Sequence, residues 1–96
     1  MKVENIINNR GNRATNQFVI HHNGDTYFQS YESVIAKYGK DGKLTITPLW
    51  DCSVTTRKHF YIFLAEYTNY NATREGVLRG IESGCIKVVK DGELDI

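Results

Sequence analysis

The chain has 96 residues, of which 41% are hydrophobic and 24% are charged, and its formal net charge is +1. A chain of this length forms one domain with a single core, so a multi-domain enzyme is excluded. The near-neutral charge excludes both a strongly basic nucleic-acid binder and an acidic mimic of DNA. We therefore expect a single domain that spans residues 1–96.

The first residues, MKVENIINN, lack the apolar core of a secretory signal, and no apolar run approaches the roughly 18 residues of a membrane span. We expect a cytosolic protein with no membrane partner. In that compartment, Cys52 and Cys85 are expected to be reduced thiols. Residues 1–9 lead into a polar loop and are expected to form a turn or a short strand.

The clearest structural prediction is a β-hairpin. Residues 17–22 and 26–31 are rich in β-branched and aromatic side chains, and the Asn23-Gly24 pair between them suits a type I′ turn. A two-residue turn places His22 opposite Asp25, Ile20 opposite Tyr27, Val19 opposite Phe28 and Phe18 opposite Gln29. A longer loop through Asp25 would shift these partners. Neither face is purely polar in this register, so we expect one face to be covered and the other to be partly covered.

Residues 31–38 fit two structures. Tyr31, Val34, Ile35 and Tyr38 have helical spacing, but the same segment can form a strand that pairs with LTIT, residues 44–47, across a turn at Asp41-Gly42. We favour a second hairpin, because a lone two-turn helix is marginal and LTIT needs a partner strand.

Two helices are expected after Pro48, which ends the preceding strand. The first carries an apolar stripe of Phe60, Phe63, Leu64 and Tyr67 and is capped by Thr55 or Thr56. The second begins at Asn71 or Thr73, contains Gly76 and Gly80, and stops at Gly84; residues 85–89 then form a last strand. The sequence thus predicts an α+β fold: an antiparallel sheet of about four to five strands with two C-terminal helices packed on one face.

Positive side chains open the first helix. Arg57, Lys58 and His59 lie in its first turn, where they meet the positive end of the helix dipole. We favour the interpretation that a nearby carboxylate such as Asp51 compensates this positive charge. The alternative is that the positive side chains mark a binding site.

The sequence gives only weak signals for metal binding and for catalysis. The zinc-competent side chains carry no CxxC, HxxxH or HExxH spacing, so we expect no metal and no cofactor; they are His21, His22, Asp25, Asp51, Cys52, His59 and Cys85. Cys52 precedes His59 by seven residues, but proximity in sequence does not place a base at the thiol. We expect the Cys52 side chain to be buried and to pack as a small hydrophobic group. We also expect that the protein is not an enzyme.

Three blocks carry a family resemblance: RGNRATNQFVI, GDTYFQSYESVIA and WDCSVTTRKHFYIFL, in this order. Over residues 8–64 the chain resembles a group of small uncharacterised proteins carried by phages and mobile elements of Firmicutes. That group usually has Tyr where this chain has Cys52, which weakens the case for a shared chemistry at this position.

The resemblance implies an anti-host function. Small phage proteins of this kind often act against the host, for example by occupying a surface of a defence nuclease as anti-CRISPR proteins do. The expected partner is therefore a host protein such as a CRISPR effector in the host cytoplasm. The alternative is a small DNA- or RNA-binding regulatory protein, and pairing of an edge strand with a second copy would give a homo-oligomer. The expected contact surface is a sheet face together with residues 10–16 and 50–58. The predicted binding residues are Arg10, Asn12, Arg13, Tyr27, Tyr31, Trp50, Arg57 and Lys58.

Overall fold

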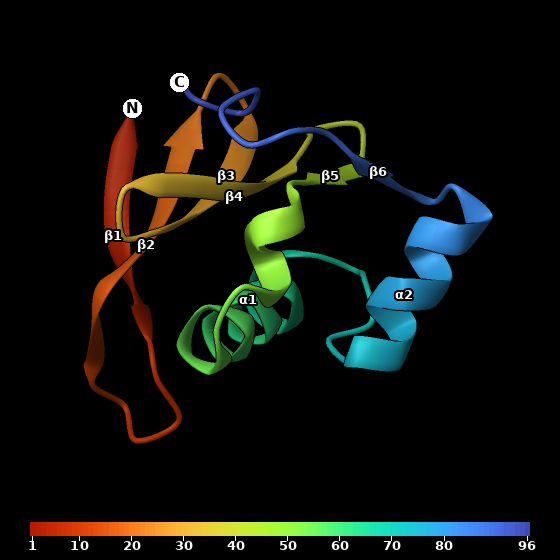
Figure 1. Ribbon diagram of the computed structural model, residues 1–96. Coiled ribbons are helices and arrows are strands. Elements are labelled where there is room, and N and C mark those ends of the chain that lie inside the picture. Colours follow the sequence, from red (N-terminus) through yellow and green to blue (C-terminus); the bar gives the residue numbers. More distant parts are fainter.

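The computed structural model describes residues 1–96 and contains one six-stranded sheet with two helices packed against it (Figure 1). The strands lie in the order in which they occur in the sequence, and only the last pair, β5 and β6, is parallel. The predicted α+β class is therefore confirmed, and residues 1–9 supply an additional edge strand. The strands are β1 (Lys2–Ile7), β2 (Arg13–His22), β3 (Asp25–Ser30), β4 (Ser33–Tyr38), β5 (Leu44–Ile46) and β6 (Ile86–Val88).

The predicted hairpin register of β2 and β3 is confirmed. His22 pairs with Asp25 and Val19 pairs with Phe28, across a turn in which Asn23 and Gly24 have φ angles of 53° and 85°. Both angles are positive, as a type I′ turn requires. The favoured strand within residues 31–38 is also confirmed, because β4 covers residues 33–38 and pairs with both β3 and β5.

The two faces of the sheet are covered to different extents, as the register predicted. One face carries the main core, in which Phe28 stacks on Phe63 of the first helix with ring centroids 5.7 Å apart. The opposite face carries a smaller cluster of Ile20, Tyr27 and Val34, and the C-terminal segment covers this cluster with Leu94.

A short 3-10 helix, η1 (Pro48–Asp51), leads into α1 (Val54–Tyr67), and α2 (Arg74–Ser83) follows. The predicted cap of α1 is wrong: Ser53 is the N-cap, and its hydroxyl accepts a hydrogen bond of 3.1 Å from the Thr56 amide. Ser53 has the extended backbone that a cap requires, whereas Thr55 and Thr56 already lie within the first helical turn. None of the helices combines the length and the apolar character needed to cross a membrane.

The second helix has the predicted ends. Thr73 is its N-cap, and Gly84 ends it with a φ angle of 85°. Within the helix, Gly80 lies directly against Ile86 of β6, where a Cβ atom would come within 2.5 Å of the Ile86 Cδ1 atom. The glycine therefore allows α2 to pack closely against the end of the sheet.

Candidate functional site

The first helix, α1, is apolar on two opposite sides. Its inner side packs Phe60, Phe63 and Leu64 into the core with no exposed surface. Its outer side carries Val54, which is 71% exposed, and Ile62, which is half-buried. A surface helix of a globular protein usually has a polar outer face. The outer face of α1 is therefore a candidate for contact with another molecule.

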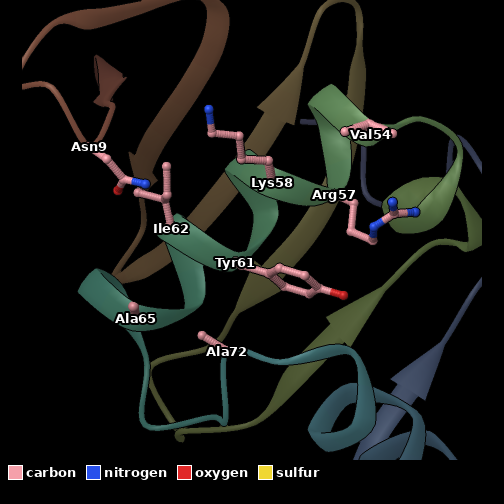
Figure 2. A pocket seen from close by; sticks show the side chains of 8 residues that line it. All are labelled: Asn9, Val54, Arg57, Lys58, Tyr61, Ile62, Ala65 and Ala72. Atoms are coloured by element: carbon pink, nitrogen blue, oxygen red, sulfur yellow. The ribbon is translucent and has the colours of Figure 1, made fainter.

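A groove follows this outer face (Figure 2). It has a volume of about 530 Å³, and five of its eight lining residues are hydrophobic. The connection between β1 and β2 contributes one wall, and the connection between α1 and α2 contributes another. We call it the α1 groove; its residues are Asn9, Val54, Arg57, Lys58, Tyr61, Ile62, Ala65 and Ala72.

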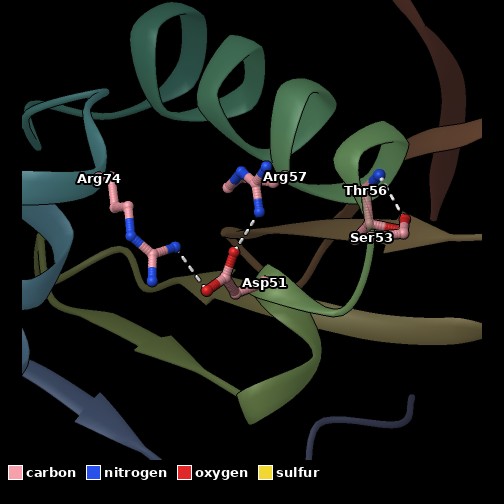
Figure 3. A network of polar contacts seen from close by, with 5 residues as sticks. All are labelled: Asp51, Ser53, Thr56, Arg57 and Arg74. Atoms are coloured by element: carbon pink, nitrogen blue, oxygen red, sulfur yellow. Dashed lines mark hydrogen bonds and ion pairs between the residues drawn. The ribbon is translucent and has the colours of Figure 1, made fainter.

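A shared carboxylate, that of Asp51, lies between Arg57, which lines the groove, and Arg74 (Figure 3). Asp51 Oδ1 accepts a hydrogen bond of 2.5 Å from Arg57, and Oδ2 accepts one of 2.5 Å from Arg74. Arg74 also lies over the ring of buried Trp50, with its guanidinium carbon 5.8 Å from the ring centroid. Asp51 is thus the carboxylate that the sequence predicted beside Arg57, and it joins η1 to both helices.

The charges in this network do not cancel. Hydrogen bonds from Arg57 and then from Arg74 lower the pKa of Asp51, so the carboxyl group is ionised at neutral pH. The same carboxylate raises the pKa of Arg74 through its hydrogen bond. Two guanidinium groups therefore share one negative charge, and the network retains a net positive charge beside the groove.

The chain segments that form the groove contain very few acidic residues. Residues 5–24 contain Arg10 and Arg13 but no Asp or Glu, and residues 52–65 contain Arg57 and Lys58 but no Asp or Glu. Lys58 lines the groove and has no ion-pair partner. The groove of this near-neutral protein is therefore lined by two positive side chains, Arg57 and Lys58, and by no acidic one.

The structure separates the predicted binding residues into surface and core positions. Tyr27 is 8% exposed and Trp50 is 5% exposed, so both rings belong to hydrophobic clusters and present no binding face. They are buried because Tyr27 faces the C-terminal segment and Trp50 packs on Phe60 of α1. The remaining predicted residues are exposed or half-buried: Arg10, Asn12, Arg13, Tyr31, Arg57 and Lys58.

Only some of these surface residues come together. Arg57 and Lys58 line the α1 groove, whereas Arg10, Asn12 and Arg13 do not. Asn9 of the same connection reaches the groove, but Arg13 lines a separate depression together with Glu4 and Tyr67. Tyr31 lies outside the groove, in the turn between β3 and β4. The prediction omitted five groove residues: Asn9, Tyr61, Ile62, Ala65 and Ala72. The apolar residues on both sides of α1 were a visible signal for those on the helix, whereas no local pattern marks Asn9.

The zinc-competent side chains are dispersed. No three His, Cys, Asp or Glu side chains lie together in an arrangement that could hold a metal ion. His21 Nε2 lies 2.7 Å from Glu4 Oε2, and His59 Nδ1 lies 2.7 Å from the Thr55 carbonyl oxygen. Cys52 is exposed and is not hydrogen-bonded to His59, which corrects the expectation that Cys52 is a buried hydrophobe. The short loop that ends η1 leaves its side chain at the surface.

The fold and the groove define a small α+β protein with a basic, partly apolar surface cleft along a helix. A family model matches residues 1–79, and the chain therefore belongs to DUF8033, a family of unknown function. The matched range contains every residue that lines the α1 groove as well as Asp51 and Arg74. No curated protein and no solved structure matches the chain.

Proposed function

We propose that this protein is a non-catalytic, phage-type inhibitor that binds a host defence protein, in the manner of anti-CRISPR proteins, and that the α1 groove is its contact surface. The observation that supports the proposal is that part of the predicted contact segment 50–58 lines a groove that is partly apolar and positively charged. Val54, Arg57 and Lys58 of this segment line the groove, and Asn9, which directly precedes the predicted segment 10–16, lines its other side.

The side chains at the groove suit an interface. Apolar surface that is already exposed, such as that of Val54, gains free energy when a partner removes it from water. Arg57 is held in place by Asp51, so little conformational entropy is lost when a partner pairs with it. Rigid, partly apolar surfaces with arginine at their edges are typical of protein–protein contacts.

Affinity capture from a host lysate tests the proposal. The tagged full-length chain is expected to retain one protein in stoichiometric amount from a lysate of a Firmicutes host, and the purified partner is expected to lose its nuclease activity when the chain is added. Recovery of no stoichiometric protein, or of a protein whose activity is unchanged, would contradict the proposal.

A second candidate function, a small DNA- or RNA-binding regulator, is supported by the acid-free segments that carry Arg10, Arg13, Arg57 and Lys58. It ranks second because the rings of Tyr27 and Trp50 are buried and cannot stack on bases. A mobility shift that weakens with salt and is lost when Arg57 and Lys58 are changed to Ala would favour this candidate.

A further inference from the structure

We propose that the α1 groove recognises an acidic segment of a partner protein that also carries apolar side chains. This inference rests on the proposed function, since it specifies the chemistry that the partner presents to the groove. It follows from three properties of the groove: its apolar floor, its positive edge and the absence of acidic lining residues.

The apolar floor runs along α1. Val54, Ile62 and Ala65 are separated by eight and three residues, so they follow one side of the helix over about 16 Å. Tyr61 and Ala72 extend this floor toward α2 (Figure 2). A partner segment with apolar side chains would remove this surface from water, which a purely charged ligand would not do.

The positive edge of the groove adds a second requirement, which is that the partner segment carries negative charge. Lys58 lies one helical turn from both Val54 and Ile62, on the same row of α1, and it has no ion-pair partner. Arg57 shares its single carboxylate, Asp51, with Arg74. No Asp or Glu lines the groove, so a carboxylate of the partner would meet only positive or neutral groups.

These two properties together favour a protein segment over a nucleic acid. Binding of a phosphate backbone needs positive charge but gains nothing from an aliphatic floor. The only aromatic ring in the groove is that of Tyr61, and its hydroxyl oxygen is buried, so the groove offers no row of stacking rings. Carboxylates interspersed with apolar side chains match both the floor and the edge.

Selection from a random peptide library displayed on phage particles tests the inference. The immobilised full-length chain is expected to enrich peptides that carry a net negative charge and several apolar residues. The affinity of one synthetic enriched peptide, measured by fluorescence anisotropy, is expected to fall about tenfold for Lys58→Glu and for Val54→Glu.

The control variants test whether the loss of affinity is specific to substitutions in the groove. Val54 is the first residue of α1, where a glutamate is favourable for the helix, so Val54→Glu is expected to fold. Lys90→Glu and Leu78→Glu, at exposed positions outside the groove, are expected to leave the affinity unchanged. Thermal unfolding followed by circular dichroism verifies that all four variants are folded.

Three outcomes would overturn the inference: no enriched peptide, enriched peptides that are neutral or basic, or displacement of the peptide by a thymidine oligonucleotide. Failure of the acidic-segment inference is distinguishable from failure of the proposed function. If a host protein is captured and lost on Val54→Glu while the enriched peptides are basic, the inhibitor proposal stands and the acidic-segment inference falls.

Discussion

The Asp51 carboxylate lies 2.5 Å from the Arg57 guanidinium, and this contact connects the end of η1 to the first turn of α1. It offsets the unfavourable position of Arg57 at the positive end of the helix dipole. The second oxygen of the same carboxylate contacts Arg74 of α2. One short side chain therefore holds both helices in the arrangement that shapes one end of the α1 groove.

Replacing Asp51 with Asn is expected to lower the free energy of unfolding by about 1 kcal/mol at pH 7, because two arginines lose their ionised partner. The pKa of Asp51 is lowered in the folded protein, so its contribution is complete above the unfolded value of 3.8 and is lost as the pH falls through the lower folded value. The difference between the two proteins should therefore shrink below pH 3.8.

Chemical denaturation at pH 7 and at low pH measures this difference. Glu75→Gln is the matched control, because the Glu75–Arg79 pair is 2.5 Å long but its side chains are 73% and 77% exposed. We expect this control to cost roughly 0.3 kcal/mol. An equal effect of the two substitutions, or a constant effect of Asp51→Asn across the pH range, would show that the network does not stabilise the fold as described.

Gly80→Ala is expected to destabilise the protein by about 1 kcal/mol, although alanine is the better helix former. The new methyl group would lie 2.5 Å from Ile86 Cδ1 and 2.8 Å from Cγ1, and Ile86 is buried in the core. Urea denaturation measures the change. The substitution should cost less in an Ile86→Val background, which removes the Cδ1 atom, and a net gain in stability on Gly80→Ala would refute the close contact.

Tyr31 has a φ angle of 56°, which an aromatic residue adopts only at a cost. Asn tolerates this conformation, so Tyr31→Asn is expected to raise the free energy of unfolding by up to about 1 kcal/mol. Tyr31→Phe keeps the strain and is expected to show no gain. Thermal melts of the two variants compare them directly, and a less stable Asn variant would mean that the exposed Tyr31 ring makes a stabilising contact.

The sequence predicted the local structure wherever a short-range rule decided it. The Asn23-Gly24 turn determined the pairing of Val19 with Phe28, and Gly84 marked the end of α2. The parallel pairing of β5 with β6 was not predictable in this way, because it joins segments about forty residues apart that no turn connects. Such pairings depend on tertiary packing, here on Gly80 against Ile86.

The candidate site was predictable only in part, for the same reason. Arg57 and Lys58 were identified from their position in the first helical turn, and Asp51 was identified as the nearby carboxylate. Trp50 and Tyr27 were placed on the surface by residue type, but long-range packing buries both. Arg74 and Asn9 reach the groove region from distant parts of the chain, and no local pattern marks either residue.

The most direct test of the central claim is quantitative affinity capture of the host partner by four versions of the full-length chain. Wild type and Leu78→Glu are expected to recover equal, stoichiometric amounts of the partner, whereas Val54→Glu and Lys58→Glu are expected to recover about tenfold less. Equal recovery by all four folded proteins would contradict the claim that the α1 groove is the binding surface.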